Sequence, residues 1–294
     1  TNGLAIDGVE AWDRSGQFVS SARDVNGDGI DDILIGAYLG GLGGETYVVF
    51  GKNTATEGDF AATLDLGTLD GTNGFALSGI EVGDWFGISV SSAGDVNGDG
   101  VDDILIGASK GGTGGEVYVV FGKDTTNDDF AANLDLATLD GTNGFTIEAI
   151  DPADNTGWSV SSAGDVDGDG FDDILVGGLN GANEVYVVFG KDTATDGDFG
   201  ATLDLGTLDG TNGFIVEGFT TLGRSVSSAG DINGDGFDDI LIGARAGDPS
   251  GSNSGETYLV FGGADSLALY DEADGTSDGA INLSLLGNDP LDFI

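Results

Sequence analysis

Short apolar runs alternate with clusters of glycine and acidic residues along the chain, and the same runs return at a regular interval. Each unit contains a VSSA segment, a DILIG or DILVG run, and a run such as VYVVF or TYVVF. These runs are rich in Val, Ile, Tyr and Phe and are bounded by Gly, Asp or Asn, which is typical of β-strands joined by tight turns. Segments such as GFALSG, GFTIEA and GFIVEG predict a fourth strand in each unit.

Some of the predicted strands are apolar at every position. Examples are Ile33-Leu34-Ile35 and Val48-Val49-Phe50. A strand with one solvated face alternates apolar and polar residues, so a continuous run predicts a sheet that is covered on both faces.

The tripeptide Thr-Asn-Gly marks the start of each unit, and its four occurrences give periods of 71, 70 and 69 residues. We therefore divide the chain into repeats of about 1–71, 72–141, 142–210 and 211–294, within a single domain covering 1–294. Short antiparallel strands covered on both faces and repeated radially describe the blades of a β-propeller. The expected fold is an all-β propeller of four blades with four strands each. A solenoid is the alternative, but its terminal repeats would need polar caps, which neither end of the chain resembles.

The chain is strongly acidic, with 52 acidic residues, 8 basic residues and a formal net charge of -44. Nucleic acid and anionic membranes are poor partners for such a chain, and cations are natural ones. No run of about 20 apolar residues is present, so we expect no membrane insertion. The sequence has no Cys and no His, which excludes Ser-His-Asp and Cys-His catalysis, disulfides, and zinc sites built on those residues.

The strongest chemical signal is a nine-residue loop in each unit, with oxygen-bearing side chains at positions 1, 3, 5 and 9 and glycine at position 6. Together with the carbonyl of position 7, these oxygens suit Ca²⁺ better than Mg²⁺, which dehydrates reluctantly. We expect about four Ca²⁺, one per repeat. The predicted ligands are Asp24, Asn26, Asp28, Ile30 and Asp32; Asp95, Asn97, Asp99, Val101 and Asp103; Asp165, Asp167, Asp169, Phe171 and Asp173; and Asp231, Asn233, Asp235, Phe237 and Asp239.

Two other interpretations of these loops are weaker. An EF-hand needs a bidentate carboxylate at position 12, where these loops have Ile or Val. Acidic β-turns closed by Asx hydrogen bonds would explain one loop more readily than four loops in register. Position 8 is also acidic in every loop, and we expect its side chain to point outward or to cap the next strand. Position 8 is occupied by Asp31, Asp102, Asp172 and Asp238.

With these loops in place, the units resemble FG-GAP repeats, the blades of the integrin α-subunit propeller, which also occur in bacterial surface and secreted proteins. The resemblance rests on the D-x-[ND]-x-D-G-x-D-D core. The FG dipeptide is retained at Phe86-Gly87, and the GAP tripeptide reads GAY, GAS, GGL and GAR in the four units. The family implies a propeller with Ca²⁺ held between the first and second strands of each blade. The integrin propeller has seven blades, whereas this chain has four units.

A ligand is expected on the face opposite the metal loops, where the family's topology places the divergent linkers and glycine-rich loops. Loops on a rigid scaffold are frequent binding sites, and Trp and Arg are frequent anchors for protein or carbohydrate ligands. The candidates are Trp12, Trp85, Trp158, Arg224 and Arg245. The alternative is that the Trp residues cover blade edges, and we consider it the stronger of the two.

The leading hypothesis is a non-enzymatic, calcium-binding adhesion or interaction module at a cell surface or outside the cell, and part of a larger chain. An accessory or catalytic propeller of a polysaccharide-acting enzyme, with carboxylates as acid and base, is the alternative. A structural spacer without a ligand is a third possibility.

A four-bladed propeller also requires a strand that joins its last blade to its first. The first GFxxxG-like strand, at residues 3–8, has no preceding blade, and the last unit lacks an outer strand, so pairing the two would close a four-bladed ring. The tail at residues 291–294 is a competitor for the same edge, and we favour the N-terminal strand.

Overall fold

The structure is a computed structural model that describes residues 3–179, 183–218, 221–247, 254–272 and 278–283. Within these ranges the chain consists mainly of strands and turns. The helices are α1 (Thr54–Glu57), α2 (Thr193–Asp196) and α3 (Ala264–Glu272), with 3₁₀ turns at Leu66–Thr68, Leu136–Thr138 and Leu205–Thr207. No helix in the described part of the chain has the length and apolar character needed to span a bilayer.

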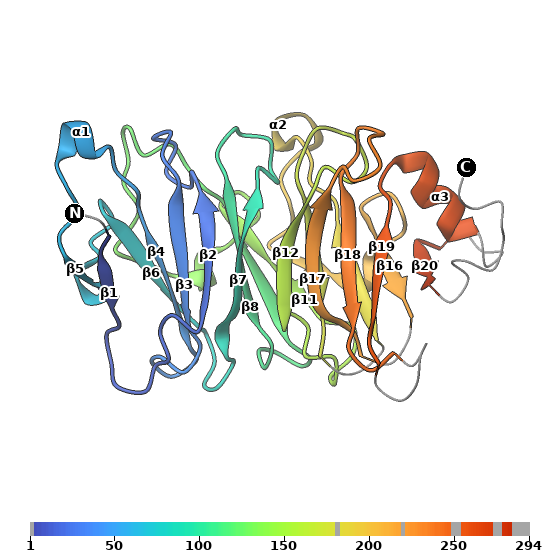
Figure 1. Cartoon of the computed structure of the whole chain (residues 1–294), viewed down its shortest axis with the longest axis horizontal. Helices are drawn as coiled ribbons and strands as arrows, with labels where there is room; N and C mark the ends of the chain where they lie inside the picture. Colours follow the sequence, from blue (N-terminus) through green and yellow to red (C-terminus); the bar gives the residue numbers. More distant parts are fainter. Residues whose placement is uncertain (1–2, 180–182, 219–220, 248–253, 273–277, 284–294) are drawn as a thin grey trace.

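The strands of the described residues form five sheets, four of which we number in chain order (Figure 1). Sheet 1 contains β2 (Phe18–Arg23), β3 (Asp32–Ala37), β4 (Glu45–Val49), β6 (Gly74–Ser78) and β10 (Asn133–Leu134). Sheet 2 contains β7 (Phe86–Gly94), β8 (Asp103–Ala108), β9 (Glu116–Val120), β11 (Gly144–Glu148) and β15 (Thr202–Asp204). Sheet 3 contains β12 (Ser159–Gly164), β13 (Asp173–Gly177), β14 (Glu184–Val188), β16 (Gly213–Glu217) and β20 (Ala280–Asn282). Sheet 4 contains β17 (Leu222–Gly230), β18 (Asp239–Ala244) and β19 (Glu256–Val260). The fifth sheet pairs β1 (Ala5–Asp7) with β5 (Thr63–Asp65).

The first four strands of sheets 1 to 3 are antiparallel neighbours, as the repeated apolar runs predict. The all-β class and the four repeated antiparallel units are therefore confirmed. In each sheet the first strand bulges just before the nine-residue loop, for example between Ser92 and Gly94 in sheet 2. The bulge turns the chain out of the ladder and into the loop.

A fifth, parallel strand in sheets 1 to 3 was not expected from the sequence. The segment that links two units, such as Asn133–Leu134, runs parallel to the outer strand of the earlier sheet. The pairing of β1 with β5 has the same form and the same register. These linking strands are two or three residues long and half polar, so no apolar run marks them in the sequence.

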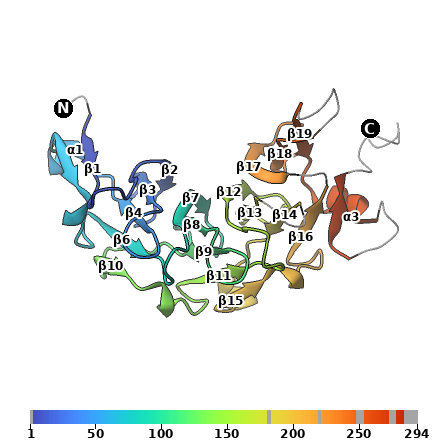
Figure 2. The ribbon, with the colours of Figure 1, turned by 90° about the horizontal axis from the view of Figure 1, so that it is seen from below.

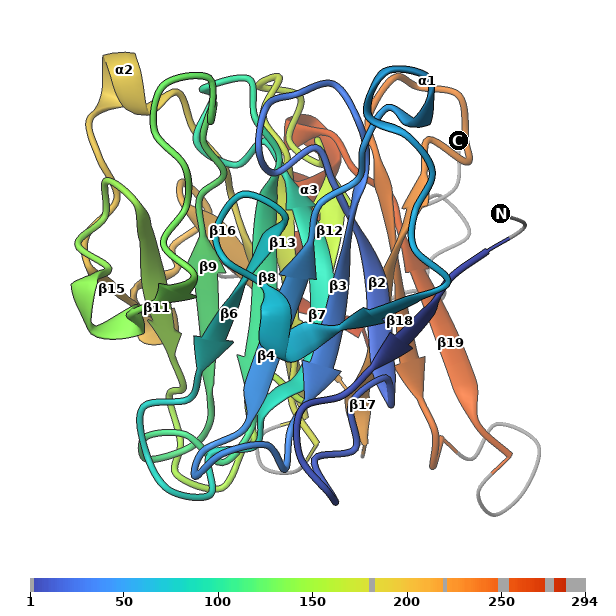
Figure 3. The same ribbon diagram turned by 90° about the vertical axis from the view of Figure 1, so that its left-hand side faces the viewer.

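The sheets stand side by side in an open arc, with β1 near one end of the arc and sheet 4 near the other (Figure 2). The expected closure through the N-terminal strand is wrong in this structure, because β1 lies along the outside of sheet 1 and pairs with β5 (Figure 3). Among the described residues β19 has one neighbour, β18. The physical reason is that β1 has the repeat register of the outer strands β6, β11 and β16 and takes the same kind of parallel partner. The tail at residues 291–294, the other candidate for closure, lies outside the described residues.

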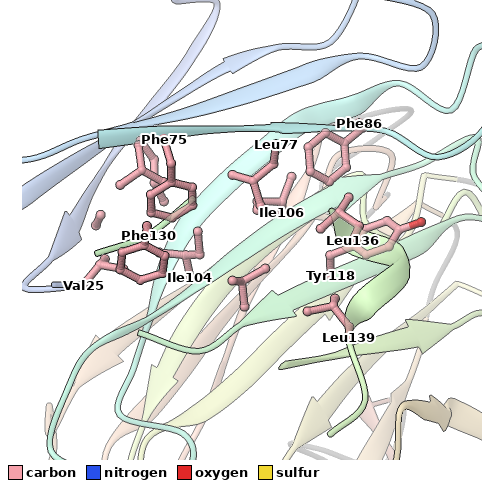
Figure 4. Packing of buried hydrophobic residues seen from close by; sticks show 14 of the residues in the cluster. Val25, Phe75, Leu77, Phe86, Ile104, Ile106, Tyr118, Phe130, Leu136 and Leu139 are labelled. Atoms are coloured by element: carbon pink, nitrogen blue, oxygen red, sulfur yellow. The ribbon is translucent and has the colours of Figure 1, made fainter. Parts of the chain in front are cut away.

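The core consists of layers between neighbouring sheets. Between sheets 1 and 2, Phe75 and Leu77 lie in one buried cluster with Ile104 and Ile106 (Figure 4). Phe75 of sheet 1 and Phe130 of the following linker stack with ring centroids 4.4 Å apart, and an equivalent pair lies one unit later. Each inner sheet is thus covered on both faces, in agreement with the continuous apolar runs.

Candidate metal centres

Each nine-residue loop joins the first two strands of its sheet, and the side chain at position 1 organises it. In the second loop, Asp95 Oδ1 accepts the backbone N–H groups of Gly98 and Asp99 at 2.8 and 3.1 Å, and Oδ2 accepts that of Gly100 at 2.8 Å. The glycine at position 6 has φ between 83° and 97° in the four loops, a backbone conformation that glycine adopts without steric cost. The loop therefore curls around its first carboxylate.

The carboxylate at position 9 is the most buried acidic group of each loop. Its exposure is 1% for Asp32 and 0% for Asp103, Asp173 and Asp239. In the second loop, Asp103 accepts one backbone N–H on each oxygen, from Val96 and from Gly122, both at 2.9 Å. None of the ion pairs recorded for the described residues includes a position 9 carboxylate.

Burial without a cationic partner disfavours the ionised form of this group. Desolvation raises the pKa of Asp103 and Asp173 well above the usual range, and that of Asp32 to about 7. The other carboxylates of the same loop act in the same direction. An ionised carboxylate in this environment requires a nearby positive charge, which a bound divalent cation would supply.

The third loop has a carboxylate at position 3 as well. Asp165, Asp167 and Asp173 each offer an oxygen, and these oxygens all lie within 4.8 Å of one another. Desolvation raises the pKa of Asp167 to about 6, and the nearby charge of Asp169 adds to the effect. Three convergent carboxylates fit a hard divalent cation that takes oxygen ligands.

Positions 5 and 7 are tied together in every loop. The backbone N–H of Val101 donates to Asp99 Oδ1 at 2.9 Å, and the other loops repeat this bond. The loop oxygens are therefore held in place by backbone donors, as the acidic-turn interpretation also requires. That interpretation leaves the buried carboxylate at position 9 without a cationic partner among the recorded ion pairs.

Position 8 contacts the neighbouring sheet, which the sequence analysis did not anticipate. Asp102 donates its backbone N–H to the carbonyl oxygen of Asp24 at 3.2 Å, and its Oδ2 accepts the N–H of Asp24 at 3.2 Å. Asp172 bonds to Asp95 in the same way, and so does Asp238 to Asp165. Arg23 Nη1 adds an ion pair to Asp102 Oδ1 at 3.4 Å. We expected this side chain to point outward or to cap the next strand; in Asp102, Asp172 and Asp238 it instead bonds to the loop of the preceding unit.

Comparison with known proteins agrees with this geometry. The FG-GAP repeat family matches residues 15–50, 86–120, 156–188 and 222–260, and each match contains one nine-residue loop. The chain is an FG-GAP repeat protein. It is 32% identical to integrin alpha-4 of Xenopus laevis over 179 residues, 59% of this chain and 16% of the relative. It is 30% identical to integrin alpha pat-2 of Caenorhabditis elegans over 244 residues, 77% of this chain and 18% of the relative. The chain thus spans less than a fifth of either integrin subunit.

The glycines that name the FG-GAP repeat meet across the sheet boundaries. A Cβ added to Gly107, in the GAP position of unit 2, would overlap the carbonyl oxygen of Gly157, in the FG position of unit 3. Gly36 and Gly87 form the same contact one unit earlier. Gly157 itself has φ of 81°. Two backbones therefore touch at these points, and a side chain would separate the sheets.

The aromatic and basic candidates for a ligand face lie at the opposite end of the strands from the metal loops, on loops except for Arg224, which is near the start of β17. The Trp85 ring is 5.9 Å from that of Tyr38 and 5.3 Å from Lys110 Nζ. Arg224 lies over Trp158 at 5.4 Å, so that pair bridges sheets 3 and 4. Two of the three Trp residues thus take part in contacts at unit boundaries, as the blade-edge alternative predicts.

Trp12 and Arg245 are the exposed members of this set, and Trp12 is 90% exposed. Two other loops at this end of the strands expose Leu42 and Val82, at 79% and 78%. The backbone N–H of Gly83 donates to the carbonyl oxygen of Leu42 at 2.9 Å, so these two loops lie side by side. The sequence analysis did not single out Leu42 and Val82, because lone apolar residues in loops carry no pattern.

Proposed function

We propose that this FG-GAP protein is a calcium-stabilised adhesion or interaction module that acts at a cell surface or outside the cell. One observation carries the proposal: in each of four loops the position 9 carboxylate is at most 1% exposed, with no cationic side chain paired to it in the described part of the chain, and in the third loop it converges with two further carboxylates. Millimolar extracellular calcium suits sites of modest affinity. The integrin alpha relatives support an adhesive role.

In this proposal each loop binds one Ca²⁺ through the side chains at positions 1, 3, 5 and 9 and the carbonyl of position 7. The ion supplies positive charge and structural cross-linking. The chain's own residues hold the ligand oxygens in place with backbone donors and couple each loop to the next sheet through position 8. Calcium would therefore fix the sheets relative to one another and keep the opposite loops in a constant arrangement.

The ligand of this module is proposed to be a protein or a carbohydrate bound by the loop face that contains Trp12, Leu42 and Val82. Apolar side chains that are this exposed are frequent at binding surfaces, and one Trp can dominate the affinity. Because the net charge is -44, nucleic acid and anionic membranes are not proposed as partners.

Enzymatic hydrolysis gains no support from the recurring aspartates outside the loops. Asp70, Asp140 and Asp209 each accept hydrogen bonds from the Thr two residues later, and these bonds hold their pKa values below the usual range. Such carboxylates are poor general acids. We therefore propose a binding role, without catalysis, for the chain.

The proposal is tested by surface binding. The chain is passed over immobilised extracellular proteins and polysaccharides, with calcium and with a chelator. Val82→Asp should weaken calcium-dependent binding by about tenfold or more, because it places a charge in the apolar contact area. Val19→Asp is the matched control, since Val19 is 65% exposed on the end of the arc and away from the loop face. Binding that is equal in chelator and calcium, or absent for every immobilised ligand, would contradict the proposal.

A further inference from the structure

The metal loops, which we number 1 to 4 in chain order, are bonded to one another through position 8. In loop 3, Asp172 donates its backbone N–H to the carbonyl oxygen of Asp95 at 3.2 Å, and its Oδ2 accepts the N–H of Asp95 at 3.0 Å. Asp95 is position 1 of loop 2, and Asp173, next to Asp172, is position 9 of loop 3. A proposed calcium ligand of one loop is therefore adjacent in the chain to the residue that holds a proposed ligand of the preceding loop.

A second connection between loops 2 and 3 runs through the segment that follows β14, residues 190–193. Gly190 donates its backbone N–H to Asp173 Oδ1 at 2.9 Å. Three residues later, Thr193 donates its backbone N–H and its hydroxyl to the carbonyl oxygen of Asn97, at 3.0 and 2.9 Å. Unit 2 repeats both bonds toward loop 1. One short segment thus holds position 9 of its own loop and position 3 of the preceding loop.

Loop 3 has one more carboxylate than the other loops. Its position 3 is Asp167, where loops 1, 2 and 4 have Asn. Oxygens of Asp165, Asp167 and Asp173 lie within 4.8 Å of one another, and no other group of three acidic side chains in the described ranges converges in this way. Calcium affinity in such loops depends on the number of charged ligands. These features favour loop 3 as the loop with the highest calcium affinity.

We propose that calcium binds first to loop 3 and that its binding there raises the affinity of loops 2 and 4. This inference rests on the calcium sites of the proposed function and adds the order in which they fill. An ion in loop 3 restrains position 9, and with it Asp172 and residues 190–193, which hold loop 2. It also restrains position 1, Asp165, which exchanges two hydrogen bonds of 3.0 Å with Asp238 of loop 4.

The coupling has an entropic origin. A loop whose ligands are already held by its neighbour loses less conformational freedom when it binds its own ion, so its affinity is higher. By linkage the effect is reciprocal, and an ion in loop 2 or loop 4 raises the affinity of loop 3 by the same factor.

Electrostatic repulsion between bound ions opposes this coupling. An ion in one loop reduces the negative potential that attracts the next ion. At physiological ionic strength this effect is screened beyond about 8 Å, whereas the direct hydrogen bonds between loops are not. The experiment therefore uses the full chain at physiological ionic strength, at a temperature at which the metal-free protein stays folded.

The glycine at position 6 gives a separate signal for each loop in an NMR titration with Ca²⁺. In every loop its backbone N–H donates to Oδ2 of the position 1 carboxylate, at 2.7 to 3.0 Å. A calcium ion bound to that carboxylate changes the chemical shift of this N–H. The four reporters are Gly29, Gly100, Gly170 and Gly236. Gly170, in loop 3, should respond at the lowest calcium concentration.

Two variants of loop 3 test the coupling. Asp169→Ala removes the position 5 ligand, and it should raise the calcium midpoints of Gly100 and Gly236 by about fivefold or more, the low end of typical coupling between sites. Asp167→Asn gives loop 3 the residue that the other loops have at position 3. It should end the early response of loop 3 and raise the same two midpoints by a smaller factor.

Asp151→Asn is the control, because it makes the same change of charge at an exposed position on the opposite loop face. It should leave all four midpoints unchanged. If no loop responds to Ca²⁺, the proposed calcium sites are wrong, and the coupling with them. If the loops respond but loop 3 does not lead, or if the loop 3 variants leave the midpoints of Gly100 and Gly236 unchanged, the sites stand and the coupling is wrong. Asp167→Asn decides the question if Asp169→Ala does not fold.

Discussion

Positions 8 and 9 of each loop are adjacent aspartates with different neighbours. In the second loop Asp103 is buried inside its own loop, whereas the Asp102 carboxylate, with 24% of its side chain exposed, reaches the backbone of the preceding loop. Position 5, occupied by Asp99, bonds within the loop. The structure therefore separates residues that would hold calcium from a residue that joins two sheets.

This separation gives a prediction for two alanine variants. Asp99→Ala should lower the melting temperature in calcium and have a small effect in chelator, because it removes a proposed calcium ligand. Asp102→Ala should lower it in both conditions, with a loss of about 1–3 kcal/mol typical of a charged hydrogen bond. Calorimetry with and without chelator measures both. If the two variants respond to calcium identically, the assignment of positions 5 and 8 is wrong.

The raised pKa of Asp32, about 7, predicts how the metal-free protein responds to pH. A carboxyl whose folded-state pKa lies above its unfolded value stabilises the fold at low pH, and this contribution is lost as pH rises through the folded-state pKa. Metal-free protein should therefore melt at a lower temperature near pH 7 than near pH 4. Calcium should reverse the trend, because it favours the ionised carboxylate. A melting temperature of the metal-free protein that rises over this range would refute the prediction.

At the scale of elements, the glycine contacts between sheets are a critical point of the packing. Gly107→Ala should destabilise the fold by about 1–3 kcal/mol, the usual cost of overpacking, because its Cβ overlaps the backbone of the next sheet. Gly243→Ala is the matched control at the same repeat position, because its added Cβ would approach Ser225 of the adjacent strand, the flexible side chain most closely, and no other sheet. Urea unfolding should show a much smaller loss for the control. Equal losses would mean that the sheet contact is not responsible.

Elements with a signal confined to a few residues were predicted from the sequence, and elements that depend on distant residues were not. The inner strands and loops were found because apolar runs and the aspartate spacing lie within a few residues. The linking strands were missed because Asn133–Leu134 has no pattern of its own and pairs with residues 57 positions earlier. The position 8 contact was missed for the same reason, since Asp102 bonds to a residue in the preceding unit. The recurrence of that acidic residue in all four loops was the available signal.

For the whole molecule, the arc differs from the expected ring because repeat register decides which strands pair. The N-terminal strand resembles the outer strands closely enough that it takes their parallel partner, β5. Closure within one chain would have required sheet 4 to reach β1 across the open side of the arc. Local sequence patterns carry no information on the distance between these two elements.

Calcium dependence is a property of the whole molecule, because all four loops contribute. We expect about four Ca²⁺ by titration calorimetry, with dissociation constants on the order of 10⁻⁴ to 10⁻³ M. At about 100 times the dissociation constant, each site adds roughly 2.7 kcal/mol, so several sites together approach the net stability of a domain. A chelator should therefore lower the melting temperature strongly, and an equal concentration of sodium should not restore it. No shift with chelator would contradict the proposed sites.

The parallel linking strands also set the order in which the chain can be completed during synthesis. The last strand of sheet 1, β10, follows β7, β8 and β9 in the chain. Sheet 1 is therefore complete only after the inner strands of sheet 2 have left the ribosome. Sheets 2 and 3 likewise receive their last strands, β15 and β20, from later segments of the chain. During synthesis the outer strand of the newest sheet therefore lacks its parallel partner until the next unit has been made. Folding advances from the N-terminus, because each unit supplies the last strand of the preceding sheet. A chaperone that binds nascent strands would bind the outer strand that still lacks its parallel partner.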